Sequence, residues 1–168
     1  FYSRIHPIKG LLELINIWSR SKTLKKMDLH VYGSIEDQSY FNKIKPLFKN
    51  NIKYLGSLNS QNKYQLLKKY NVLIYPSYSE NFGIIILEAL NAGLYVLIRK
   101  NLPWKKLNSK FGKLININKN SLEKNIISLG KKVKSEKINH NKRYLRNYLI
   151  SNFGWKKISN LYLKIYNI

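Results

Sequence analysis

The sequence predicts an α/β domain with a doubly wound, six-stranded, mainly parallel sheet, helices on both faces and a helical C-terminus. Short apolar runs rich in β-branched and aromatic residues recur along the 168-residue chain. Segments with helical periodicity separate these runs, and glycine or proline follows several of them. No repeat, linker or low-complexity segment interrupts this pattern, so we expect one domain over residues 1–168.

The candidate strands are short runs in which apolar, β-branched and aromatic residues predominate, as expected of a sheet covered on both faces. They are residues 1–5, 29–32, 52–55, 72–75, 95–98 and 113–117. Gly33, Gly56 and Pro76 fall just past strand ends, where turns are expected.

Between the strands, apolar residues recur three and four positions apart, which predicts amphipathic helices. The stripes are Leu11, Leu12, Leu14, Ile15 and Trp18; Tyr40, Phe41, Ile44, Leu47 and Phe48; and Tyr64, Leu67 and Tyr70. Ser60 is placed as the N-cap of the third helix. After residue 120 the pattern becomes helical and lysine-rich, and it ends in an amphipathic run, Ile158, Leu161, Tyr162 and Ile165.

The composition is strongly basic, with 31 Lys and Arg against 8 Asp and Glu and a formal net charge of +23. Three interpretations follow: a solvated lysine-rich surface, peripheral contact with an anionic membrane, or nucleic-acid binding. Only 5 of the 31 cations are arginine, the residue suited to bidentate phosphate contacts, so nucleic acid is the least favoured partner. Cysteine is absent, which excludes disulfides and fits a reducing compartment. No apolar run approaches the roughly 20 residues of a membrane span, so we expect a soluble, cytoplasmic chain.

Residues 76–90 carry the strongest functional signal. A strand is expected to end at Tyr75 and a helix to begin near Phe82 or Gly83. Backbone N–H groups and the positive end of the helix dipole would then meet at the ligand-binding edge of the sheet. This arrangement suits a phosphate, and Gly83 would let the backbone approach it closely.

Two carboxylates belong to the same segment. Glu88 lies in a helix whose other residues are nearly all apolar, so we expect it to be buried and to need hydrogen-bond partners. The vicinal hydroxyls of a ribose would supply them; the alternative is a lysine partner or a capped backbone group. Glu80 would lie nearer the sugar end of the same ligand, or it is an acidic residue of the kind favoured at a helix start.

Two cations flank the first predicted junction of strand and helix. Arg4 closes the strand and Lys9 opens the helix, so both would converge on the same edge of the sheet. Together they would hold a diphosphate and stabilise the charge that develops on it. Taken singly, either residue is better explained as surface charge in a chain this basic; their joint position weakens that interpretation.

Other sites are disfavoured by what the sequence lacks. It contains neither Gly-x-Gly-x-x-Gly nor Gly-x4-Gly-Lys-Ser/Thr, which argues against nicotinamide dehydrogenases and phosphate-loop NTPases. His6, His30 and His140 are scattered, without acidic or thiol neighbours at ligand spacing, so no metal site is predicted.

These elements together resemble the glycosyl transferases group 1 family, retaining glycosyltransferases of the two-domain GT-B fold. Arg4 with Lys9-Gly10 is similar to the family's Arg-x4-Lys-Gly element. Residues 76–88 are similar to its Pro-Ser-x-x-Glu-x-Phe-Gly signature with two glutamates separated by seven residues. Weaker similarities lie at residues 29–33, 52–56, 92–93 and 153–155, so the resemblance covers almost the whole chain.

The resemblance implies a Rossmann-like domain that binds a nucleotide-sugar, and a role for each residue. Arg4, Lys9 and Glu80 would be the catalytic set, with Arg4 and Lys9 on the donor diphosphate and Glu80 on hydroxyls of the transferred sugar. Glu88 would bind the ribose. The remaining donor-binding residues would be Gly33, Tyr54, Leu55, Asn81, Phe82, Gly83 and Ile84, with Tyr54 and Leu55 at the base.

The implied reaction transfers a sugar from a UDP-sugar or GDP-sugar to a glycan or lipid-linked acceptor, at the inner membrane face, without a metal or other cofactor. We expect this chain to lack the N-terminal acceptor domain of the family, and therefore to bind the donor with little transfer. A binding module without activity and a basic nucleic-acid-binding domain are the alternatives. The chain departs from the family at Tyr95, usually proline, and at residues 101–106, which replace a loop with Gly-Gly and Pro-Glu pairs.

Overall fold

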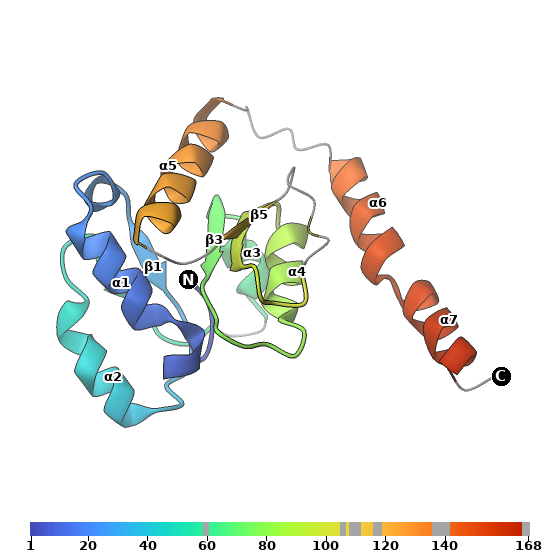
Figure 1. Cartoon of the computed structure of the whole chain (residues 1–168), viewed down its shortest axis with the longest axis horizontal. Helices are drawn as coiled ribbons and strands as arrows, with labels where there is room; N and C mark the ends of the chain where they lie inside the picture. Colours follow the sequence, from blue (N-terminus) through green and yellow to red (C-terminus); the bar gives the residue numbers. More distant parts are fainter. Residues whose placement is uncertain (59–60, 105–106, 108–111, 116–118, 136–141, 166–168) are drawn as a thin grey trace.

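A computed structural model of the chain describes residues 1–58, 61–104, 107, 112–115, 119–135 and 142–165 (Figure 1). The strands are β1 Leu29–Val31, β2 Ile52–Tyr54, β3 Val72–Tyr75, β4 Tyr95–Arg99 and β5 Gly112–Ile115. They form a two-stranded sheet, β1-β2, and a three-stranded sheet, β3-β4-β5. Every pairing is parallel, with Leu29 opposite Ile52 and Val72 opposite Tyr95. The predicted parallel α/β architecture is confirmed.

The prediction of one six-stranded sheet is wrong for the described residues, because residues 1–5 form no regular strand. They run parallel to the segment after β1 through isolated bridges, Tyr2 with Tyr32 and Ile5 with Ile35. The N–H of Ser3 donates to the carbonyl of Tyr32 (3.0 Å). The N–H of Ile5 donates to the carbonyl of Ser34 (2.8 Å), while the N–H of Gly33 between these bonds donates to Gly56 (2.9 Å), toward β2. Residues 1–5 are thus bonded to the segment after β1 on both sides of Gly33, but only through two separate bridges.

Helices connect the strands as the stripes predict. They are α1 Leu11–Arg20, α2 Gln38–Ile44, α3 Lys63–Leu67 and α4 Ile84–Asn91, with 3-10 turns at Pro7–Lys9, Leu24–Lys26 and Lys45–Leu47. The predicted N-cap Ser60 lies outside the described residues, and Asn62 occupies the N-cap position of α3. The helical C-terminus is confirmed: α5 Lys119–Ser135, α6 Lys142–Phe153 and α7 Trp155–Ile165, of which α7 projects from the body (Figure 1).

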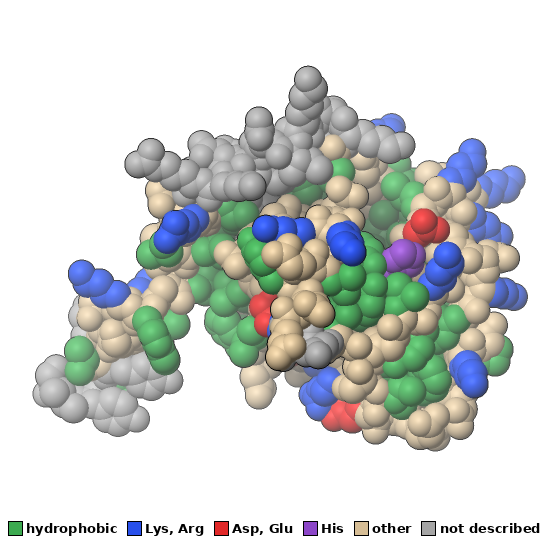
Figure 2. All heavy atoms as spheres, turned by 180° about the vertical axis from the view of Figure 1, so that it is seen from behind, with side chains coloured by type: hydrophobic (Ala, Val, Ile, Leu, Met, Phe, Trp, Pro, Cys, Tyr) green, Lys and Arg blue, Asp and Glu red, His purple; other side chains and the backbone are tan. Residues whose placement is uncertain are grey.

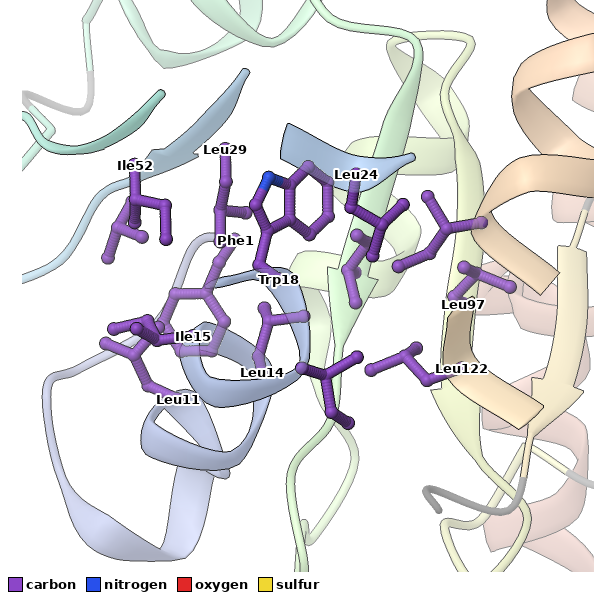
Figure 3. Packing of buried hydrophobic residues seen from close by; sticks show 14 of the residues in the cluster. Phe1, Leu11, Leu14, Ile15, Trp18, Leu24, Leu29, Ile52, Leu97 and Leu122 are labelled. Carbon is purple, nitrogen blue, oxygen red and sulfur yellow. The ribbon is translucent and has the colours of Figure 1, made fainter. Parts of the chain in front are cut away.

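Two hydrophobic clusters cover opposite faces of β4. Tyr95 and Leu97 join a cluster with α1, α2 and α5 (Figure 3). Val96 and Ile98, the alternate residues, join a second cluster with α4 and α6. Since successive side chains of a strand point to opposite faces, this alternation confirms the prediction of helices on both faces.

None of the described helices combines the length and the apolar character needed to cross a bilayer. Figure 2 shows lysine and arginine side chains spread over one face of the molecule among polar and hydrophobic ones.

Candidate functional site

A cavity of about 710 Å³ lies beside the carboxyl ends of β1 and β3 and the start of α4. Nine of the eleven residues singled out in the sequence line it: Arg4, Lys9, Gly33, Glu80, Asn81, Phe82, Gly83, Ile84 and Glu88. The sequence did not single out the other lining residues, Tyr2, Ser3, Ile8, Ser34, Ser57, Leu58, Tyr75, Ser79 and Ile85. The position agrees with the rule that ligands of open α/β sheets bind beyond the carboxyl ends of the strands.

Two loops that are distant in sequence form adjoining walls of the cavity because they are in close contact. Gly10, with φ +70°, caps the 3-10 turn Pro7–Lys9. A Cβ at Gly10 would lie 2.5 Å from the carbonyl oxygen of Pro76, so only glycine permits this approach. The N–H of Tyr78 donates to the carbonyl of Ile8 (2.8 Å). These contacts bring Lys9 next to Glu80.

Lys9 and Glu80 form an ion pair between Nζ and Oε1, with side chains only 7% and 10% exposed. The hydroxyls of Tyr75 (2.6 Å) and Ser77 (2.9 Å) donate to the same oxygen. Burial raises the pKa of Glu80, but the hydrogen bonds from Lys9, Tyr75 and Ser77 together lower the pKa below its usual value. Glu80 is therefore ionised at neutral pH and fully supplied with donors on Oε1.

Tyr75 and Ser77 are functional candidates that the sequence analysis missed. Ser77 is fully buried, and Tyr75 is 3% exposed. Burial raises the pKa of Tyr75, and its hydrogen bond to Glu80 raises it further, so the phenol remains a donor at neutral pH. The only signal in the sequence is that Tyr75 and Ser77 lie at the carboxyl end of β3, the edge of the sheet at which ligands are expected to bind.

The pH dependence of stability should report the environment of Glu80. Because its folded pKa lies below the ordinary value of 4.5, its stabilising effect is complete above that value and is lost as pH falls through the folded pKa. We expect the free energy of unfolding, measured by urea denaturation between pH 7 and pH 3, to fall less steeply in Glu80→Gln than in the wild type. Glu36→Gln, in an exposed pair, is the control. Equal slopes for Glu80→Gln and the wild type would contradict this prediction.

Glu88 lines the cavity but is not buried as expected. Its side chain is 29% exposed and forms an ion pair with Lys63 of α3, whose side chain is 25% exposed. The apolar run around it is not buried on all sides, since Ile84 is 65% exposed. The face of α4 that borders the cavity is open. Of the two sequence interpretations, the lysine partner is present in this structure.

Arg4 and Lys9 line the same cavity, as the sequence predicted, but in different environments. The side chain of Arg4 is 59% exposed, and its guanidinium pairs with Glu36, so this contact contributes little to stability. Each cation has an acidic partner, and each retains N–H donors beyond the single bond recorded to that partner.

The cavity reaches the N-terminus of α4. This helix begins at Ile84, close to the predicted start, and Gly83 is its N-cap with φ +77°. No side chain caps it, and its first turn contains no acidic residue. The first N–H groups of a helix lack intrahelical acceptors, so this end favours an anion.

Tyr54 and Leu55 lie outside the lining of this cavity. The Tyr54 ring packs against Phe41 at a centroid distance of 4.9 Å, and its hydroxyl donates to the carbonyl of Gly33 (2.8 Å). Leu55 is 42% exposed. Tyr54 therefore contacts the site through Gly33.

The described residues contain no group of three or more His, Asp or Glu side chains placed as metal ligands would be. The candidate site consists of cations, carboxylates, hydroxyls and backbone N–H groups, which suits a phosphorylated, hydroxyl-rich ligand.

The chain is similar to known proteins in sequence and in fold. The chain is 34% identical over 99 residues to alpha-1,3/1,6-mannosyltransferase ALG2 of Candida glabrata, covering 58% of this chain and 21% of the mannosyltransferase. Among solved structures, S. aureus TarM has a TM-score of 0.78 at 20% identity, covering 99% of this chain and 34% of TarM. Anabaena HepE has a TM-score of 0.77 at 19% identity, covering 99% and 47%.

The chain thus spans less than half the length of each of these relatives. Its fold is that of the C-terminal, Rossmann-like domain of GT-B glycosyltransferases. Residues 1–144 match the family described as Glycosyl transferases group 1. Since this match covers most of the 168 residues, the chain belongs to the glycosyl transferases group 1 family.

Proposed function

We propose that the chain binds a nucleotide-sugar in the 710 Å³ cavity, as the donor domain of a glycosyltransferase. The observation that carries the proposal is the convergence of Arg4, Lys9, Glu80, Glu88 and the start of α4 on one cavity. Its volume lies within the range of about 300–1,000 Å³ typical of small-molecule sites. Relatives support the ligand class: TarM is described in complex with UDP, and HepE with UDP and with UDP-glucose.

The cations and the helix N-terminus would bind the diphosphate. Arg4 is exposed and would turn from Glu36 at little cost, because exposed ion pairs contribute about 0–1 kcal/mol. Lys9 would keep its bond to Glu80 and offer its remaining N–H donors to a phosphate oxygen. Their charges would stabilise the diphosphate as it departs from the sugar.

The two carboxylates would bind hydroxyls at opposite ends of the diphosphate. The recorded contacts of Glu80 are all to Oε1, so Oε2 would accept from a hydroxyl of the sugar. Glu88 bonds to Lys63 through Oε1 and would accept from the ribose hydroxyls. Asn81 to Ile84 would contact the sugar and phosphate through the backbone. Gly33 would border the nucleotide, with Tyr54 and Leu55 toward the base.

The proposed reaction is metal-independent transfer with retention of configuration, to a glycan or lipid-linked acceptor held by a second domain. The proposed location is the cytoplasm, with the lysine-rich surface against anionic lipids of the inner membrane face. The second candidate function is a domain that binds the donor but does not take part in transfer. It is motivated by the segment 101–104, whose sequence departs from the family pattern and which contains the buried Trp104.

Calorimetry with UDP, GDP and their glucose and mannose conjugates tests the proposal. We expect at least one ligand to bind with a Kd of about 1 mM or tighter, which is the weak affinity expected of an isolated donor-binding domain. Glu88→Gln should weaken binding about tenfold or more, because bonds to a charged group contribute about 1.5–3 kcal/mol. Replacing the ribose of the ligand by 2′-deoxyribose should also weaken the affinity less in this variant than in the wild type.

Asp28→Asn is the control, because Asp28 is exposed and does not line the cavity, and its substitution should leave the Kd within about twofold. The proposal is wrong if the folded wild-type chain binds none of these ligands. Transfer restored by adding an acceptor-binding domain would exclude the second candidate function.

A further inference from the structure

Trp104 joins the segment after β4 to the loop that borders the cavity. Its side chain is 2% exposed, and its indole N–H donates to the carbonyl oxygen of Phe82 (2.6 Å). The ring packs against both Phe82 and Phe153, at centroid distances of 5.4 and 4.8 Å. The indole N–H of this buried side chain would be costly to leave without an acceptor, so the bond holds the carbonyl in one direction.

The direction of this carbonyl fixes the N–H of the next residue. In a trans peptide the C=O and N–H groups point in opposite directions. Gly83 lines the cavity and Trp104 does not. With the Phe82 carbonyl bonded to Trp104, the N–H of Gly83 points away from the indole, which does not line the cavity, and belongs to a residue that does.

Gly83 is also constrained by the start of α4. It has φ +77° and ψ 59° and is the N-cap of α4. A Cβ on Gly83 would lie 3.2 Å from Ile86 Cδ1 and 3.7 Å from the indole nitrogen of Trp104. Rotation of the Phe82–Gly83 peptide would therefore break the indole bond and disturb the start of the helix.

We propose that Trp104 is a positioning residue for donor binding: it orients the Phe82–Gly83 peptide so that the N–H of Gly83 donates to the outer phosphate of the nucleotide diphosphate. This inference rests on the proposed function and extends it to a buried side chain that touches no ligand. It also assigns a role to the segment 101–104, where the sequence departs from its family.

The test compares Trp104→Phe with Trp155→Phe. Phenylalanine keeps an aromatic ring against Phe82 and Phe153 but removes the N–H donor. Trp155 is 80% exposed, so the same substitution there controls for the loss of an indole. Titration calorimetry measures the affinities of each chain for the nucleoside diphosphate that the wild type binds and for the corresponding monophosphate. Thermal unfolding shows that the variants are folded.

We expect Trp104→Phe to weaken diphosphate binding about five- to tenfold, the effect of one mispositioned hydrogen bond, while monophosphate binding changes less than about twofold. Trp155→Phe should match the wild type in both. A merely structural role would weaken both ligands together, and that result would overturn the inference, as would unchanged diphosphate affinity in Trp104→Phe. If the wild type binds no nucleotide, the proposed function fails and this inference fails with it.

Discussion

Replacing Lys9 by methionine should destabilise the fold by about 3 kcal/mol and abolish binding of the diphosphate. Lys9 is 5% exposed, and its Nζ pairs with Glu80, whose side chain is 10% exposed. Methionine fills similar space but leaves the Glu80 carboxylate without its cation, and unpaired buried charges are strongly unfavourable. Urea denaturation at pH 7 measures the stability, and calorimetry measures the binding.

The double variant Lys9→Met with Glu80→Gln separates the two effects. Removing both charges should recover most of the stability, because a buried ion pair contributes little more than neutral side chains of similar size. Nucleotide binding should stay lost, since the cation is still missing. A single variant that is as stable as the wild type, or a double variant that binds normally, would contradict this account of the pair.

The second large effect is expected for Gly33→Ala, which should cost at least about 3 kcal/mol of unfolding free energy. A Cβ at Gly33 would lie 1.6 Å from the carbonyl oxygen of Ser3 and 2.6 Å from its carbonyl carbon. Both atoms belong to backbone that pairs with the segment after β1, so neither moves aside without breaking hydrogen bonds. Thermal and urea unfolding measure the loss.

Gly56→Ala is the matched control for this prediction. Gly56 also has a positive φ, +79°, but a Cβ there would meet nothing within 4 Å. Its cost should be limited to the backbone strain, about 1–2 kcal/mol. Equal destabilisation by the two substitutions would show that backbone strain, and not the contact with Ser3, dominates at Gly33.

Much of the fold could be predicted from local patterns. The run at residues 72–75 and the stripe from Leu11 to Trp18 each match an observed element, β3 and α1, because burial selects apolar residues at the period of each structure. Residues 1–5 also contain apolar residues, but they pair with the segment after β1 only through the isolated bridges of Tyr2 and Ile5. Such contacts depend on tertiary packing, which local patterns do not encode.

The residues around the cavity could be predicted for a geometric reason: the carboxyl ends of parallel strands meet at one edge, which brings Arg4 and Glu80 to the same cavity. Their partners could not. Lys9 and Glu80 are 71 positions apart, and charge alone does not reveal which opposite charges pair. The apolar residues around Glu88 predicted burial, but Ile84 beside the cavity is 65% exposed.

The contact between the 3-10 turn and the Pro76 loop affects how a ligand would enter. The turn that carries Lys9 and the loop that carries Glu80 are joined at the backbone, by the close approach of Gly10 to Pro76 and by the bond between Tyr78 and Ile8. These two walls are thus preorganised as one rigid body. A ligand seated between them would lose little free energy to ordering these loops, which leaves more of its contact energy for affinity.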